Sequence, residues 1–143
     1  MPHNLQIVID CADPHPLAAW WAETLEWMVE PQDADFIRSM IDQGFASDDD
    51  TTTYDANLVW KEAVAIHPDT EKSPARPRIL FQKVPEPKTV KNRIHLDIRP
   101  EGVDVEELRD LLVDRGATVL YQGQQGPRTW LTMTDPEGNE FCI

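Results

Sequence analysis

At 143 residues the chain has the usual length of one domain, which leaves no room for a second independent domain. Hydrophobic residues make up 41% of it and charged residues 27%, the balance of a globular protein, and no apolar run approaches the roughly 18 residues of a transmembrane helix. The formal net charge of −13 and the scattered Lys and Arg residues disfavour a nucleic-acid partner.

The chain begins with a predicted strand and an amphipathic helix. Residues 5–10 (LQIVID) have strand composition, and Asp13 offers an N-cap followed by Pro14 at the first helical position. The helix is expected to run to about residue 25, because its apolar residues recur at the spacing of one buried stripe: Leu17, Trp20, Trp21 and Leu25. Residues 27–29 predict a short second strand.

A longer and less regular stretch follows. Asp33 and Gly44 bound a second helical pattern that contains Phe36, Ile37, Met40 and Ile41. The acidic, threonine-rich residues 46–54 lack periodicity and predict an exposed loop, after which residues 56–66 return to strand composition. Residues 67–76 predict another loop, and residues 78–84 (RILFQKV) predict a strand.

The remaining segments repeat the opening order. Residues 92–99 (NRIHLDIR) predict a strand, and Asp104 caps a helix whose stripe is Leu108, Leu111 and Leu112, with Gly116 as its C′ residue. Three strands follow at 118–121, 128–134 and 139–143, the last two joined by the turn at residues 135–138. The chain therefore predicts strand, helix and three strands, twice.

The two halves also match in sequence. Ile7-Val8-Ile9-Asp10 opens the first half and Ile94-His95-Leu96-Asp97 opens the second, each followed by a proline and an amphipathic helix. We predict an α+β fold with two βαβββ modules that form a curved, partly open mixed sheet around a pocket, with the helices on the outer face. The single domain would span 1–143, with module 1 at about 1–87 and module 2 at about 88–143.

Strand alternation sorts the opening residues of both halves into two faces. The apolar set is expected under the helices and consists of Ile7, Ile9, Ile94, Leu96 and Ile98. The other set holds Asp10, His95, Asp97 and Arg99 and would line the concave face. A face with so many titratable groups is typical of a binding pocket, because burying them without a ligand is costly.

The element order, the segment Asp135-Pro136-Glu137-Gly138-Asn139-Glu140-Phe141 and the Trp-rich first helix resemble the vicinal oxygen chelate superfamily of glyoxalases, bleomycin-resistance proteins and extradiol dioxygenases. Residues 9–14, 80–88 and 91–97 resemble its glyoxalase-like subfamily. The resemblance implies a small-molecule ligand and a homodimer. Relative to the subfamily, Glu26 stands where glycine is common after the first helix, and a left-handed backbone there would cost about 1 kcal/mol.

The resemblance also implies a divalent metal held by the first and last strands of each module. Its ligand positions fall at His95, near Gln6 or Val8, near Gln82 and at Cys142, where a glutamate is expected. A set of histidine, glutamine and cysteine is poorly suited to Mg²⁺, Mn²⁺ or Fe²⁺. Zinc bound through His95 and Cys142 is the form that this set allows.

His95 is the expected general base or acid, with Asp10 and Asp97 to orient it or work beside it. Gln82, Trp130, Thr132 and Arg99 are the expected substrate-binding residues. Structural roles stay open for several of them. His95 could hold Asp97 or Arg99 in place, Asp10 could cap backbone groups, and Gln82 could bridge strands.

Three classes of function remain at this point. The first is an enzyme of the lyase, isomerase or dioxygenase type, the second a non-catalytic protein that sequesters a drug or metabolite, and the third a module whose pocket is only structural. We expect a cytoplasmic protein with no membrane partner, in which Cys11 and Cys142 are buried thiols rather than a disulfide. His3, His15 and His67 are expected to be exposed.

Overall fold

The computed structural model describes residues 1–69 and 77–143, which form an α+β fold and confirm the predicted fold class. The chain divides into two compact units, Met1–Pro87 and Lys88–Ile143. Most of the loop predicted for residues 67–76 lies outside the described residues. None of the described helices combines the length and the apolar character that crossing a membrane requires.

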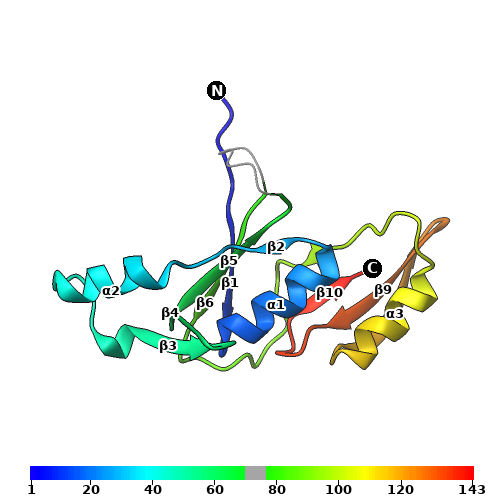
Figure 1. Ribbon diagram of the computed structural model, residues 1–143. Helices are drawn as coiled ribbons and strands as arrows, with labels where there is room; N and C mark the ends of the chain where they lie inside the picture. The colour runs from blue at the N-terminus through cyan, green and yellow to red at the C-terminus, as the bar shows by residue number, and fades with distance from the viewer. Residues whose placement is uncertain (70–76) are drawn as a thin grey trace. The chain divides into compact units, whose positions relative to one another are not determined.

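The first unit is built on a four-stranded sheet with the order β1-β6-β5-β2. Its elements are β1 (Ile7–Cys11), α1 (Pro14–Leu25), β2 (Met28–Val29), β5 (Ala63–His67) and β6 (Ile79–Lys83). β1 and β6 run parallel, and the other neighbours are antiparallel. Helix α1 packs on β5 and β6 (Figure 1) and buries Leu17, Trp20 and Trp21, as its apolar stripe predicts.

An insertion separates β2 from β5 in this unit. It contains α2 (Ala34–Asp42), a 3-10 turn η1 (Asp48–Asp50), β3 (Thr51–Tyr54) and β4 (Asn57–Trp60). Asp33 caps α2 through its carboxylate, as predicted, but the exposed loop predicted for 46–54 is wrong in its second half. Asp55 and Ala56, both at positive φ, close β3 and β4 into a two-residue hairpin that the non-periodic sequence did not reveal.

Two histidines predicted to be exposed are buried. His15, on α1, stacks on Tyr54 of the hairpin and contacts the Trp60 carbonyl oxygen through Nε2 at 2.7 Å. His67 lies at the end of β5 and is also buried. Both predictions are wrong because each histidine contacts another element of the unit: His15 lies against the β3–β4 hairpin, and His67 pairs with Met28 of β2. His3 is exposed, as predicted.

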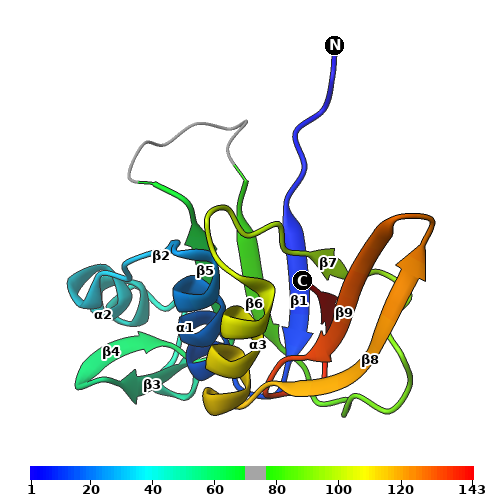
Figure 2. The same ribbon diagram turned by 90° about the vertical axis from the view of Figure 1, so that its right-hand side faces the viewer.

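The second unit repeats the topology of the first. Its elements are β7 (Leu96–Asp97), α3 (Val105–Asp114), β8 (Thr118–Gln125), β9 (Arg128–Thr134) and β10 (Glu140–Cys142), and the strand order is β7-β10-β9-β8. Figure 2 shows α3 and the long β8–β9 hairpin. The core of this unit contains Leu112 of α3, Met133 of β9 and Phe141 of β10, all fully buried.

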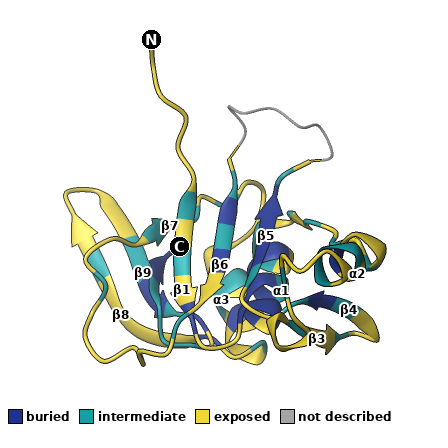
Figure 3. Cartoon of the chain, turned by 90° about the vertical axis from the view of Figure 1, so that its left-hand side faces the viewer, coloured by how far each residue is buried: buried dark blue, intermediate teal, exposed yellow. Residues whose placement is uncertain are grey.

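The registers of the two sheets correspond residue by residue. In the first unit Ile9 pairs with Phe81 and Asp10 with Gln82; in the second Leu96 pairs with Phe141 and Asp97 with Cys142. Phe81 and Phe141 are both fully buried. Exposed and less exposed residues alternate along β1 (Figure 3), in accord with the predicted two faces. The match between Ile7–Asp10 and Ile94–Asp97 therefore has a structural counterpart.

The strand predicted for residues 92–99 is much shorter than expected. Only Leu96 and Asp97 form β7, and the prediction that Ile94 is buried is wrong, since 87% of it is exposed. Asn92 is held by side chains instead of a strand partner: its backbone N–H donates to Glu140 and its amide Nδ2 to the Asn139 side-chain oxygen. These bonds replace a regular ladder before Leu96.

Glu26 has the left-handed backbone that its place after α1 suggested, with φ 55° and ψ 37°. We expect Glu26→Gly to raise the free energy of unfolding by about 0.5–1 kcal/mol, because glycine adopts positive φ without a Cβ clash. Urea denaturation would measure the change. Glu23→Gly, within the helix, is the matched control and should instead lower stability by about 1 kcal/mol. A loss of stability in both variants would contradict the assignment of strain to Glu26.

Candidate functional site

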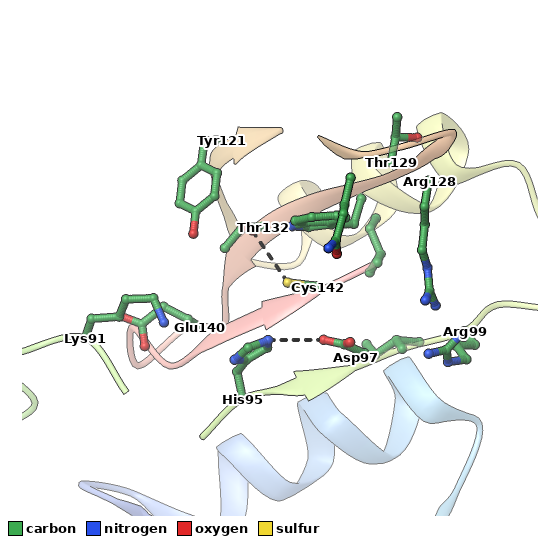
Figure 4. Close-up of a pocket in the computed structure, with 14 residues that line it drawn as sticks. Lys91, His95, Asp97, Arg99, Tyr121, Arg128, Thr129, Thr132, Glu140 and Cys142 are labelled. Atoms are coloured by element: carbon green, nitrogen blue, oxygen red, sulfur yellow. Dashed lines mark hydrogen bonds and ion pairs between the residues drawn. The ribbon is translucent and has the colours of Figure 1, made fainter. Parts of the chain in front are cut away.

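One face of the second sheet carries a row of polar side chains that crosses all four strands. Asp97 pairs with Cys142, Cys142 with Thr132, and Thr132 with Tyr121. The opposite face holds the buried Phe141 and Met133. The polar row forms part of the wall of a cavity of about 480 Å³ that lies wholly within Lys88–Ile143 (Figure 4).

Residues two positions along each strand extend this wall, because they share the same face. Glu140 precedes Cys142 on β10, and Trp130 precedes Thr132 on β9. His95 and Arg99, just beyond the two ends of β7, line the cavity on either side of Asp97. Trp130 pairs with Gly123 across the hairpin, and a Cβ atom at Gly123 would lie 2.2 Å from the indole. The glycine therefore leaves the space in which the Trp130 ring rests.

Three potential ligand groups meet in the cavity. His95 Nε2 lies 3.3 Å from Asp97 Oδ1, and one donor atom from each of His95, Asp97 and Cys142 falls within 4.8 Å of the others. The His95 and Asp97 side chains are 42% and 55% exposed, whereas Cys142 is buried. The Cys142 Sγ and Thr132 Oγ1 atoms are 3.5 Å apart. A ligand could reach the imidazole and the carboxylate directly.

The donor set suits zinc better than a hard cation. Zinc takes thiolate sulfur, imidazole nitrogen and carboxylate oxygen in a tetrahedron, and catalytic zinc sites use three protein ligands and leave the fourth position open. His95, Asp97 and Cys142 supply one donor of each kind. Asp97 is a third potential donor in this cluster, and the sequence had suggested it only as a catalytic partner of His95.

Glu140 is anchored at the end of the cavity near Lys91 (Figure 4). Its carboxylate accepts hydrogen bonds from the Lys88 ammonium and from the Asn92 backbone N–H, both at 2.9 Å, and the Lys88 ammonium also donates to the Val90 carbonyl. Burial alone would raise the pKa of Glu140, but these two donors outweigh it and hold the pKa below its ordinary value.

We expect Glu140→Gln to lower the free energy of unfolding at pH 7 by about 1.5 kcal/mol, the worth of a hydrogen bond to a charged group. Because the folded pKa is depressed, the carboxylate stabilises the fold fully above the unfolded pKa of about 4.3, and this contribution is lost as pH falls through the folded value. Chemical denaturation between pH 7 and pH 3 should therefore show the two proteins converging. Glu101→Gln, at an exposed position, is the control and should leave the free energy of unfolding at pH 7 unchanged.

The structure brings six of the expected site residues into this one cavity: His95, Asp97, Arg99, Trp130, Thr132 and Cys142. Asp10 and Gln82 lie instead on the first unit, as neighbours across β1 and β6, and both are exposed. The cavity is also lined by three residues that were not predicted from the sequence: Lys91, Tyr121 and Arg128. Arg128 could have been found, because it precedes Trp130 and Thr132 at the same two-residue spacing.

The sequence model of the glyoxalase-like domain family matches residues 6–143. No curated protein matches the chain significantly. Solved structures share its fold at low identity. Fosfomycin resistance protein FosX from Listeria monocytogenes has a TM-score of 0.60 and 10% identity, with 99% of this chain and 91% of that chain covered. Trypanothione-dependent glyoxalase I from Leishmania major has a TM-score of 0.55 and 14% identity, with 99% and 85% covered.

A third similar structure is a glyoxalase/bleomycin resistance protein/dioxygenase family enzyme from Burkholderia phytofirmans, with a TM-score of 0.57, 14% identity and coverage of 96% of this chain and 94% of that chain. The family match over residues 6–143, together with the shared fold, defines a protein of the vicinal oxygen chelate class. Within that class, the chain belongs to the glyoxalase-like domain family.

Proposed function

We propose that the cavity in Lys88–Ile143 binds a small metabolite and that the protein is an enzyme of the lyase, isomerase or dioxygenase type. The observation that supports this most is the meeting of His95, Asp97 and Cys142 in a cavity with an aromatic wall at Trp130. Pockets that place a few polar groups against an apolar wall suit small ligands. We further propose that the two units are modules of one domain, since a single family match spans both.

Without a bound metal, His95 is the proposed general acid or base, because imidazole is the side chain suited to proton transfer near neutral pH. Asp97 Oδ1, 3.3 Å from Nε2, orients the ring and stabilises it when protonated. Thr132 and Trp130 position the ligand from β9, and Arg99 binds it at the other side of Asp97. The roles expected for Asp10 in catalysis and Gln82 in substrate binding stay predictions.

We propose zinc as the metal, held by His95, Asp97 and Cys142. Bound there, zinc would polarise a substrate oxygen as a Lewis acid. In that form His95 and Asp97 act as metal ligands rather than as an acid–base pair, and Trp130 covers one side of the ligand.

The alternative function is sequestration of a drug or metabolite without turnover. It is favoured by the fold shared with a fosfomycin resistance protein, which shows that this architecture also occurs in resistance proteins. The two functions need the same cavity and differ in whether the ligand is converted.

We also propose a homodimer located in the cytoplasm. The edge strand β8 exposes Val119 and Leu120, an apolar strip that a second copy could cover. Cys11 and Cys142 are buried and form no disulfide among the described residues, in keeping with a reducing compartment. Sedimentation would test the dimer, and a monomer at all concentrations would exclude it.

A thermal-shift screen of a metabolite library tests the function. A ligand at a hundred times its Kd should stabilise the protein by about 2.7 kcal/mol. His95→Ala should abolish this shift and keep the unliganded melting temperature, while His3→Ala, an exposed control, should keep the shift. Following each hit by NMR then separates the functions, since conversion indicates an enzyme and an unchanged ligand indicates sequestration. Hits that stabilise His95→Ala as strongly as the parent would overturn the proposal.

A further inference from the structure

The cavity in the second unit has the opposite charge balance from the chain as a whole. The chain carries a formal net charge of −13, yet three cationic side chains line the cavity against two carboxylates: Lys91, Arg99 and Arg128 against Asp97 and Glu140. Glu140 is already paired with the Lys88 ammonium at 2.9 Å. A cavity of this kind in an acidic protein attracts anions locally while the rest of the surface repels them.

Arg99 and Arg128 come from different elements to the same end of the cavity. Arg99 follows β7 and Arg128 opens β9, and in Figure 4 the Arg128 side chain points toward Arg99, on the side of Asp97 away from His95. Lys91 and Glu140 lie at the opposite end. The two guanidinium groups thus share one end of the cavity and leave the aromatic wall and the imidazole between them and Glu140.

The two arginines also differ from other arginines of the chain. Arg38, Arg78 and Arg109 each bind a carboxylate at 3.0–3.1 Å. No ion pair within residues 1–69 and 77–143 involves Arg99 or Arg128. Two unpaired cations at the same end of a cavity repel, so a negative group between them would lower the energy of both. Guanidinium presents a planar fork of donors that matches the oxygens of carboxylate, phosphate and phosphonate.

We propose that the ligand of this cavity carries an oxyanion group, held between Arg99 and Arg128, and that its remainder extends along Trp130 toward His95. The inference rests on the proposed function, because it names the chemical class of the ligand for that same cavity. Carboxylates and phosphorus oxyanions share the required chemistry, and the experiment below separates them.

Matched aromatic probes test the proposal without knowledge of the natural ligand. Phenylphosphonate, benzoate and the uncharged benzamide offer the same ring to Trp130 and differ in the group presented to the arginines. In NMR titrations of the full chain, at least one of the two anions should bind at least about tenfold more tightly than benzamide, as expected for charge-assisted hydrogen bonds. The tighter anion identifies the phosphorus or the carboxylate class.

Arg99→Gln and Arg128→Gln should each lower the affinity for the tighter-binding anion by about tenfold or more, and should leave the affinity for benzamide unchanged. Arg93→Gln removes the same charge from an exposed residue outside the cavity wall and should change neither affinity. The inference would be overturned if the anions and benzamide bound with equal affinity. It would also be overturned if Arg93→Gln lowered the anion affinity as much as Arg99→Gln and Arg128→Gln.

The outcome is separable from that of the proposed function. His95→Ala should keep most of the anion affinity, because the imidazole lies on the far side of Asp97 from the arginines. If the arginine variants have no effect while His95→Ala still abolishes the shift of a screened metabolite, only this inference falls. If His95→Ala does not change the thermal shift caused by screened metabolites, while the arginine variants lose anion affinity, the anion site is supported and the proposed role of His95 is wrong.

Discussion

Purified protein is expected to bind about one zinc ion per chain, and both His95→Ala and Cys142→Ser are expected to lower zinc affinity by at least about 100-fold. The physical reason is the loss of one of three donors in a cluster whose ligand atoms lie within 4.8 Å of one another. Competition with a chromogenic chelator would measure the affinity, and elemental analysis the stoichiometry. Asp97→Asn should give a smaller loss, because the amide oxygen remains a weak donor.

Cys11→Ser is the matched control for the cysteine variant. Cys11 is also a buried thiol, but it lies in the first unit and its Sγ donates to the Gln82 carbonyl oxygen at 3.5 Å. It should leave zinc binding unchanged. Cys142→Glu should shift the preference from zinc toward Mn²⁺ or Mg²⁺, since a carboxylate replaces a soft ligand. Zinc bound with equal affinity by the parent, His95→Ala and Cys142→Ser would exclude this cluster as the metal site.

The second large effect concerns Asp135, the buried first residue of the turn before β10. Its Oδ1 accepts the backbone N–H groups of Glu137 and Asn139 at 2.9 and 3.0 Å, and its Oδ2 accepts the Asn139 amide at 3.1 Å. Asp135→Ala leaves these donors without that acceptor and is expected to cost about 3 kcal/mol. Urea denaturation would measure the loss.

Asp104→Ala is the control, because Asp104 precedes α3 without a side-chain capping bond and should cost less than about 1 kcal/mol. Asp135→Asn keeps one acceptor oxygen, so its loss in free energy of unfolding should lie between those of Asp135→Ala and Asp104→Ala. Equal losses for Asp135→Ala and Asp104→Ala would show that the carboxylate does not hold the turn. A large loss for Asp135→Ala would also indicate that the turn holds Glu140, the first residue of β10, in place.

The element order was predictable because each βαβββ half carries its own periodicity. The apolar stripe of α1 and the alternation along β9 both depend on local burial, and β9 was predicted with its observed bounds of Arg128–Thr134. The β3–β4 hairpin was missed because its turn uses Asp55 and Ala56 at positive φ without a glycine. The strand around His95 was predicted too long because side chains of Asn92 and Asn139 replace backbone pairing there.

The candidate site was partly predictable for the same reason. A two-residue period places His95, Asp97 and Arg99 on one face, and it places Trp130 and Thr132 together on another strand. The alternation of residues along one strand does not determine how that strand is aligned with its neighbours. The pairing of Asp97 with Cys142 was therefore revealed only by the structure. Tyr121 was missed because an irregularity between Val119 and Tyr121 shifts the register of β8 against β9.

Chemical-shift mapping of a hit from the metabolite screen tests the central claim most directly. The first unit offers a competing groove of about 400 Å³, lined among others by Gln32, Trp60 and the ion pair of Arg78 with Glu30. We predict that amide shifts on binding concentrate in β7, β9 and β10, around His95, Thr132 and Cys142. Shifts confined to Met1–Pro87, with those three residues unperturbed, would contradict the assignment of the ligand site.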